Sequence, residues 1–159
     1  MKILFVCLGN ICRSPLAEGI MKDKIYRYSL DAEVDSAGFE SFHVGDGADP
    51  RSSEIAAKNG ISLDRHVARK FTTRDFDYYD RIFVMDRYNY QDVMRIARND
   101  RDRSKVDYIL NLVKPGEDQE VPDPYYGGKD GFESVFRMLD NACSVLLEEI
   151  KPDNRKSKK

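Results

Sequence analysis

The sequence contains few of the residues that build disulfide scaffolds and metal centres. It has three cysteines and two histidines among 159 residues. A secreted disulfide scaffold normally carries an even set of cysteines, so we expect no structural disulfide and a reducing compartment. Because no cysteine or histidine pair has the spacing of a structural zinc site, we also expect no bound metal.

Long apolar runs are absent as well. A membrane-spanning helix needs about 20 consecutive apolar residues, and no stretch approaches that length. The amino terminus runs from Met1 directly into a strand-like segment, without the charged, apolar and small-residue regions of a targeting peptide. We therefore expect a cytoplasmic protein that does not engage a membrane.

A surplus of basic charge is absent outside the end of the chain. The formal net charge is −2, but residues 151–159 hold five basic residues against one acidic residue. A tail this short and polar cannot bury apolar surface, so it should be a flexible extension. Residues 1–150 carry no basic surplus that would favour nucleic acid, and we expect them to form a single domain that acts as a monomer.

Strand-like and helix-like segments alternate along the chain. Unalternated apolar runs rich in β-branched and aromatic residues are typical of parallel strands covered on both faces, and an alternating run fits an edge strand. The predicted strands are residues 3–6, 82–85, 106–110 and, at the edge, 33–37. The predicted helices are residues 16–28, 51–59, 88–97 and a last helix from the N-cap Asp130 to Ile150.

This alternation predicts the fold class. Strands and helices in alternation with short connections form an α/β three-layer sandwich, in which a parallel sheet is flanked by helices. Ligand sites in such folds lie beyond the carboxyl ends of the strands. The charged run 98–105 is expected to be a solvated helix end and loop.

The stretch VCLGNICRSPLAEG, residues 6–19, joins the first predicted strand to the first predicted helix. Gly9 and Asn10 tolerate backbone conformations that cost other residues more. Ser14 and Pro15 are typical of the N-cap and the first position of a helix. Backbone N–H groups in such a loop, together with the positive end of the helix dipole, bind anions. The loop therefore predicts a phosphate cradle.

Cys7 and Arg13 give this cradle its chemistry. Arg13 offers a planar fork that suits two phosphate oxygens at once, which a lysine could not supply. A helix N-terminus and an arginine both favour the thiolate form of a nearby cysteine, so Cys7 is the predicted nucleophile. The Ser14 hydroxyl can hydrogen-bond the sulfur as it attacks and as it departs.

A proton donor is predicted in the stretch EVPDPYYGGKDG, residues 120–131. Expelling a phenolate, whose conjugate acid has a pKa of about 10, requires an acid near the leaving oxygen. Asp123 lies between two prolines, which hold its backbone extended and its carboxyl group in place. Tyr125 and Tyr126 can wall a deep slot for an aromatic ring, which favours phosphotyrosine over phosphoserine.

Together these motifs resemble the low-molecular-weight protein tyrosine phosphatases. The resemblance implies a four-stranded parallel sheet, no cofactor, and hydrolysis of protein phosphotyrosine and aryl phosphates through a cysteinyl phosphate. It makes Cys7 the nucleophile, Arg13 the phosphate clamp and Asp123 the general acid and base. The motifs that carry it, in the order of the family, are VCLGNICRSP at 6–15, DSAG at 35–38, HVAR at 66–69, DF at 75–76, MD at 85–86 and DPYYGG at 123–128.

The resemblance also implies supporting roles. Asn10 would be the strained centre of the loop, held by Ser36 and His66, with Asp86 orienting that histidine. The phosphate-binding loop would comprise Leu8, Gly9, Asn10, Ile11, Cys12 and Ser14. It would take tyrosine-phosphorylated proteins, and anions such as phosphate, vanadate or sulfate.

The entrance of the site would be lined by Phe42, Tyr125 and Tyr126, together with Leu8 and Ile11 of the loop. His43, beside Phe42, is expected to be a solvated loop residue, with contact to the substrate as the alternative. Reversible disulfide formation between Cys7 and Cys12 is a further implication of the resemblance. Such a partner would protect a reactive thiolate from irreversible oxidation.

Two other functions start from the same loop. An arsenate reductase of this general fold needs further resolving cysteines in a mobile segment, but Cys143 falls on the apolar stripe of the last predicted helix and is expected to be a buried hydrophobe. A silent phosphotyrosine-binding module would lack the nucleophile or the acid, whereas Cys7, Ser14 and Asp123 are all present.

Overall fold

The computed structural model describes residues 1–152, apart from the side chains of Tyr126 and Lys129. Residues 153–159, which make up most of the predicted basic tail, lie outside the described part. Four strands form one parallel sheet in the order β2-β1-β3-β4, as the resemblance implied. They are β1 (Lys2–Val6), β2 (Glu33–Ala37), β3 (Arg81–Val84) and β4 (Val106–Tyr108).

Strand β1 lies inside the sheet between β2 and β3. Leu4 is in register with Asp35 of β2 on one side and with Ile82 of β3 on the other. Residues 3–6 are fully buried, which explains the unalternated apolar run. Strand β2 has a neighbour on one side alone, so the prediction of an edge strand is confirmed.

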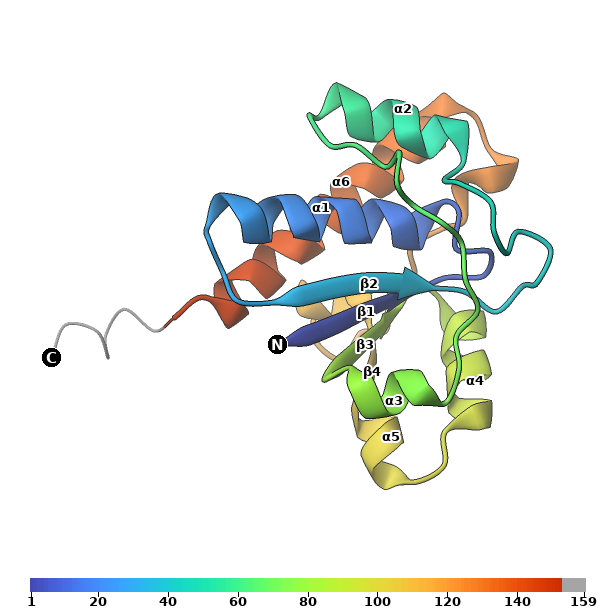
Figure 1. Ribbon diagram of the computed structural model, residues 1–159, viewed down its shortest axis with the longest axis vertical. Helices are drawn as coiled ribbons and strands as arrows, with labels where there is room; N and C mark the ends of the chain where they lie inside the picture. The colour runs from blue at the N-terminus through green and yellow to red at the C-terminus, as the bar shows by residue number, and fades with distance from the viewer. Residues whose placement is uncertain (153–159) are drawn as a thin grey trace, which may run out of the picture.

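Helices cover both faces of the sheet, so the predicted three-layer α/β sandwich is confirmed (Figure 1). One face carries α1 (Arg13–Arg27), α2 (Pro50–Lys58) and α6 (Lys129–Ile150), and the other carries α3 (Arg74–Tyr78), α4 (Arg87–Ile96) and α5 (Asp100–Ser104). Two short 3-10 helices, η1 (Ile109–Leu112) and η2 (Pro124–Tyr126), follow the last strand.

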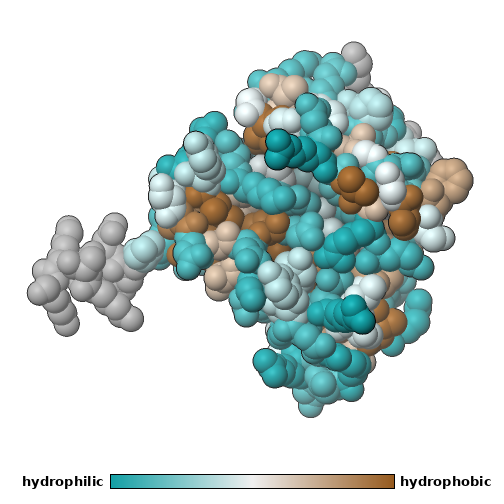
Figure 2. Space-filling model, viewed as in Figure 1, coloured by the Kyte–Doolittle hydropathy of each residue, from teal (hydrophilic) through white to brown (hydrophobic). Residues whose placement is uncertain are grey.

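The core is divided by the sheet into two apolar clusters. Ile3 and Phe5 point into the cluster with α1 and α6, whereas Leu4 and Val6 point into the cluster with α3 and α4. Cys143 of α6 is fully buried in the first cluster, as predicted, and this burial raises the pKa of its thiol to about 12. Figure 2 shows a mostly hydrophilic surface on the face that it presents.

Several predicted boundaries are wrong by a few residues. Helix α1 begins at Arg13 with Cys12 as N-cap, because the Cys12 carbonyl already accepts the hydrogen bond of Leu16 N–H. Ser14 therefore lies inside the helix and its hydroxyl does not cap it. Helix α6 begins after Gly128 rather than after Asp130, which lies in the first turn, where the helix dipole favours a carboxylate.

The charged run 98–105 was predicted to be a solvated helix end and loop, but residues 100–104 form a helix of their own, α5, and one of its residues is buried. Asp102 of α5 is buried, and Arg98 donates to its carboxylate at 2.8 Å. Strand β4 also ends at Tyr108, two residues early, because the chain turns there into η1. Within residues 1–152, no helix is both long and apolar enough to span a membrane.

Candidate active site

The loop between β1 and α1 lies at the carboxyl edge of the sheet and curls around an open centre. The backbone N–H groups of residues 8–13 donate no hydrogen bond to any described residue. Such unpaired donors next to a helix N-terminus form a concave anion site. The predicted phosphate cradle is therefore present as a backbone arrangement.

Asn10 holds the shape of this loop. Its φ is +54°, a left-handed conformation that asparagine adopts more readily than most residues. Its side-chain amide donates to Ser14 Oγ at 2.8 Å and to Ser36 Oγ at 2.9 Å. His66 Nε2 donates to the Asn10 carbonyl at 2.6 Å, and Arg69 N–H donates to its side-chain oxygen at 3.0 Å. The expected contacts of Asn10 with Ser36 and His66 are confirmed.

The expected contact between Asp86 and His66 is wrong. Glu18 of α1 accepts a hydrogen bond from Ser36 Oγ at 2.6 Å, and the same oxygen lies 3.9 Å from His66 Nδ1. Asp86 instead accepts from Arg13. Glu18 lies near Ser36 and His66 because it follows Ser14 by one helical turn on the same face of α1. Asp86, in contrast, precedes a helix on the other face of the sheet.

Two glycines bring the loop close to its neighbours. A Cβ atom on Gly38, just after β2, would lie 2.7 Å from the Leu8 carbonyl oxygen and 2.9 Å from Asn10 N. Gly9 does not use the conformational freedom of glycine, since its φ is not positive. A Cβ on Gly9 would lie 3.2 Å from the His43 ring, a tight contact that the ring would have to yield to by a few tenths of an ångström.

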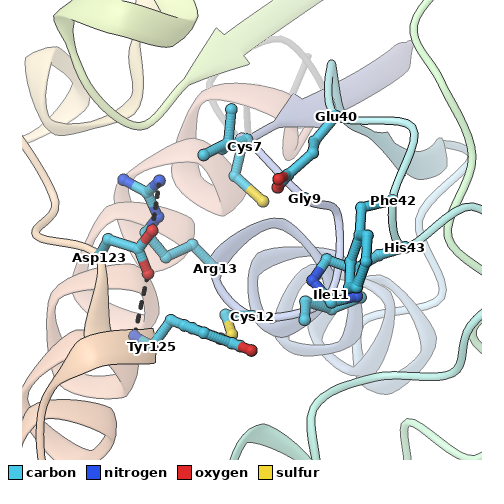
Figure 3. Close-up of a pocket in the computed structure, with 11 residues that line it drawn as sticks. Cys7, Gly9, Ile11, Cys12, Arg13, Glu40, Phe42, His43, Asp123 and Tyr125 are labelled. Atoms are coloured by element: carbon cyan, nitrogen blue, oxygen red, sulfur yellow. Dashed lines mark hydrogen bonds and ion pairs between the residues drawn. The ribbon is translucent and has the colours of Figure 1, made fainter.

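Cys7 lies at the end of β1, directly beneath the loop. Its sulfur lies 2.9 Å from Ser14 Oγ. Ser14 Oγ also accepts from the Asn10 amide, and it keeps a proton that it can donate to the sulfur when Cys7 is a thiolate. Cys7 is 3% exposed, yet it borders a cavity of about 280 Å³, so a phosphoryl group can reach it (Figure 3).

Arg13 is 2% exposed, and its guanidinium is held by hydrogen bonds on the side away from the cavity. Its Nη1 donates to Asp86 Oδ2 at 2.7 Å and to the Val121 carbonyl at 2.9 Å. The edge formed by Nε and Nη2 makes no hydrogen bond with the described residues. Burial opposes the charge of Arg13, but Cys7 and Asp86 outweigh it and raise the pKa of the guanidinium, so the clamp stays charged.

Cys12 borders the same cavity but has a different environment. It is 5% exposed, and burial together with the carboxylate of Asp49 raises the pKa of its thiol. Cys7, Cys12 and Cys143 are all free thiols. No cluster of three or more candidate metal ligands occurs among the residues that the structure describes.

Asp123 lies across the cavity from the loop (Figure 3). Its backbone is extended, as the flanking prolines predicted, with φ −78° and ψ 113°. Its Oδ1 accepts from Tyr125 N–H at 2.9 Å, and its Oδ2 lies 3.7 Å from Arg13 Nη2. Its side chain remains 31% exposed, so the carboxyl group can meet the leaving oxygen of a substrate in the cavity.

The entrance of the cavity is lined by Leu8, Phe42 and Tyr125, as expected from the resemblance. Phe42 is 80% exposed and extends from the rim. The side chain of Tyr126 lies outside the described part of the structure. Of the two interpretations of His43, the solvated loop residue is wrong and the position beside the substrate is supported: His43 lines the cavity, packs edge-on against Phe42 and pairs with Asp46 at 3.1 Å.

One lining residue was not singled out from the sequence at all. Glu40, three residues after β2, points its carboxylate into the cavity (Figure 3). A lone glutamate in a loop carries no periodic or motif signal, so nothing in the sequence distinguishes it from a solvated one.

Comparison with known proteins decides what this site belongs to. The family model of low molecular weight phosphotyrosine protein phosphatases matches residues 2–156. The chain belongs to this family. The phosphatase is 45% identical over 152 residues to a putative low molecular weight protein-tyrosine-phosphatase of Synechocystis, covering 94% of this chain and 96% of that one.

Solved structures of relatives share the whole fold of this phosphatase. A protein tyrosine phosphatase of Entamoeba histolytica, solved with Hepes in its active site, superposes with a TM-score of 0.87 at 37% identity, covering 100% and 99% of the two chains. The YwlE arginine phosphatase of Bacillus subtilis, a mutant with a phosphorylated active-site serine, gives a TM-score of 0.86 at 30% identity, covering 98% and 99%.

Proposed function

We propose that this phosphatase hydrolyses protein phosphotyrosine and aryl phosphates in two displacements on Cys7. The observation that carries the proposal is the cavity of about 280 Å³, which is bordered at once by the Cys7 sulfur, Arg13 and Asp123. An anion held by the free N–H groups of residues 8–13 would place phosphorus over the sulfur. The sheet supports this arrangement, because Cys7 directly follows β1 while β3 leads to Asp86, which anchors Arg13.

In the first displacement, the Cys7 thiolate attacks phosphorus and a sulfur–phosphorus bond forms as the phosphorus–oxygen bond to the phenol breaks. Asp123 donates its proton to the departing oxygen. Arg13 and the loop N–H groups hold the negative charge of the three equatorial oxygens. Ser14 donates to the sulfur, an interaction that stabilises the thiolate before attack.

In the second displacement, water attacks the cysteinyl phosphate. Asp123, now a carboxylate, accepts a proton from that water, an oxygen–phosphorus bond forms, and the sulfur departs as a thiolate. The same Ser14 hydroxyl stabilises the departing sulfur. Inorganic phosphate leaves and Asp123 is again protonated, so the cycle closes without any further reactant.

The walls of the cavity support an aromatic substrate. Phe42 and Tyr125 flank the entrance, and rings stack or meet edge to face at such a slot. The relatives support an anion in this site, since the Entamoeba enzyme was solved with Hepes in its active site and the YwlE mutant is phosphorylated on its active-site serine. We therefore propose tyrosine-phosphorylated proteins as substrates, with phosphate, vanadate and sulfate as ligands of the loop.

The two rival functions have weaker support. An arsenate reductase needs an accessible resolving cysteine beyond the loop, and Cys143 is fully buried in the core. A silent binding module has no use for a hydroxyl that donates to the sulfur, which Ser14 supplies here. A single domain over residues 1–150, a monomer and a cytoplasmic location remain proposals that rest on the sequence.

The test is hydrolysis of p-nitrophenyl phosphate, a phosphotyrosine peptide and phosphoarginine by the purified protein, with and without EDTA and vanadate. We expect turnover of the first two substrates, competitive inhibition by vanadate and no effect of EDTA, because Arg13 and backbone N–H groups carry the charge. Turnover of phosphoarginine with none of phosphotyrosine would overturn the proposed substrate. If the protein reduced arsenate and hydrolysed none of these substrates, the proposed reaction would be wrong.

A further inference from the structure

Glu40 is fixed directly over the phosphate loop. Its backbone N–H donates to the Leu8 carbonyl at 2.9 Å, and the preceding Phe39 N–H donates to the same oxygen at 2.8 Å. Its Oε2 lies 3.6 Å from the point where a Cβ on Gly9 would stand. Glu40 is exposed, so its carboxylate lies at the mouth of the cavity rather than on its floor.

The carboxylate of Glu40 has no hydrogen bond or ion pair with any described residue. The other acidic groups around the site have cationic or histidine partners: Asp86 with Arg13, Asp49 with Arg51 and Asp46 with His43. Figure 3 shows Glu40 on the far side of the cavity from Asp123. One side of the mouth therefore presents an uncompensated negative charge.

This charge opposes the reaction that the site performs. A carboxylate beside the path of a phosphoryl dianion repels it, and the low-dielectric protein beneath the mouth screens the repulsion less than open water would. Arg13 attracts the dianion from the buried side of the cavity, but it forms no ion pair with Glu40 and leaves the charge at the rim uncompensated. A cation carried by the substrate would turn the repulsion into attraction.

We infer that Glu40 is a specificity-determining residue, which selects phosphotyrosines that have a lysine or arginine next to them in the sequence. The inference rests on the proposed function of the site. Phe42 and Tyr125 would hold the phosphotyrosine ring, so the cation that meets Glu40 at the rim belongs to a flanking residue of the peptide. Charge complementarity of this kind at an exposed position discriminates between partners more than it raises affinity for all of them.

The experiment compares kcat/KM for two phosphotyrosine peptides that differ in having lysine or glutamate beside the phosphotyrosine. We expect the wild-type enzyme to prefer the lysine peptide by about tenfold at low ionic strength, and the preference to fall as salt is added. Glu40→Gln should reduce the preference to about twofold, and Glu40→Lys should invert it. Most of the change should appear in KM rather than kcat, because the charge acts on binding.

Glu148→Gln is the matched control, since Glu148 is an exposed glutamate in the last turn of α6, at the opposite end of the molecule from the loop (Figure 1). It should retain the wild-type preference. Equal kcat/KM for both peptides in the wild type, or an undiminished preference in Glu40→Gln, would overturn the inference.

Parallel assays separate this inference from the proposed function. Hydrolysis of p-nitrophenyl phosphate without discrimination between the peptides would overturn the role of Glu40 and leave the phosphatase chemistry standing. If the wild-type enzyme hydrolysed neither p-nitrophenyl phosphate nor the phosphotyrosine peptides, the proposed function itself would be overturned. Phosphoarginine turnover that falls in Glu40→Gln, with no discrimination between the peptides, would show that the carboxylate meets the phosphorylated residue and would overturn selection of a flanking cation.

Discussion

Cys7 and Cys12 lie in the same loop, are both buried and border the same cavity. Their surroundings differ. The sulfur of Cys7 lies 2.9 Å from the Ser14 hydroxyl beneath a ring of free N–H groups, whereas the thiol of Cys12 is buried near the Asp49 carboxylate, and both burial and that carboxylate raise its pKa. Burial alone therefore does not decide whether a cysteine is a nucleophile. The charge and hydrogen bonds around each sulfur decide it.

The largest effect is expected at Cys7. Cys7→Ser should lower kcat on p-nitrophenyl phosphate by about 10⁴-fold or more, because the hydroxyl is a far weaker nucleophile at neutral pH than the thiolate. Binding of vanadate or phosphate, measured by calorimetry, should survive, since the N–H groups and Arg13 are unaltered. Turnover within tenfold of wild type would contradict a covalent intermediate on Cys7.

The second largest effect is expected at Asp123, the proposed acid, which lies across the cavity from both cysteines. Asp123→Asn should lower kcat on phosphotyrosine by about 10² to 10³-fold, because the phenolate must then leave without a proton. The loss on p-nitrophenyl phosphate should be smaller, and a burst of nitrophenol should remain, since the nitro group stabilises the phenolate. Equal losses on both substrates, measured by stopped flow, would argue against Asp123 as the acid.

A smaller effect is expected from substitution of Asn10, whose side chain holds the Ser14 hydroxyl beside the Cys7 sulfur. Asn10→Ala removes the amide that donates to Ser14 and Ser36 and also places alanine at a φ of +54°. We expect kcat/KM to fall about 10 to 100-fold and stability to fall by about 2 kcal/mol, as measured by urea unfolding.

Asn10→Gly separates the two causes of that loss. Glycine accepts the positive φ but cannot make the side-chain hydrogen bonds, so it should recover part of the stability and little of the activity. Full recovery of activity in Asn10→Gly would show that the hydrogen bonds do not matter to Cys7.

The smallest effect is expected at Cys12. Cys12→Ser should change kcat/KM on p-nitrophenyl phosphate by less than about threefold, because this thiol stays protonated beside Asp49 and a hydroxyl can take its place. Iodoacetate at neutral pH should label Cys7, with protection by phosphate, and leave Cys12 unlabelled in a peptide map. If iodoacetate labelled Cys12 as fast as Cys7, the proposed difference in reactivity between the two thiols would be wrong.

The sequence predicts most reliably what is encoded locally. The apolar run before Cys7, the turn-forming Gly9 and Asn10 and the start of α1 are all consecutive, so the loop and its support by a parallel sheet can be inferred from a few residues. The prolines around Asp123 likewise fix an extended backbone without help from the rest of the chain.

Contacts between distant segments could not be inferred in the same way. Glu18, Glu40 and Asp102 are single charged residues without a motif around them, and their positions beside the site or inside the protein depend on packing between elements far apart in the chain. The partner of Asp86 was misassigned for the same reason: a motif shows that a carboxylate is needed at the site, but the order of strands in the sheet decides that it meets Arg13.

The two anchors of Arg13 have a consequence for the synthesis of the protein. Cys7 and Arg13 leave the ribosome early, but Asp86 and the Val121 carbonyl, which hold the guanidinium in place, follow much later. A nascent chain that has not reached Val121 therefore has Cys7 and Arg13 but lacks at least one of the groups that hold the guanidinium. We expect translation products that end before Val121 to be inactive on p-nitrophenyl phosphate, because they also lack the proposed acid Asp123.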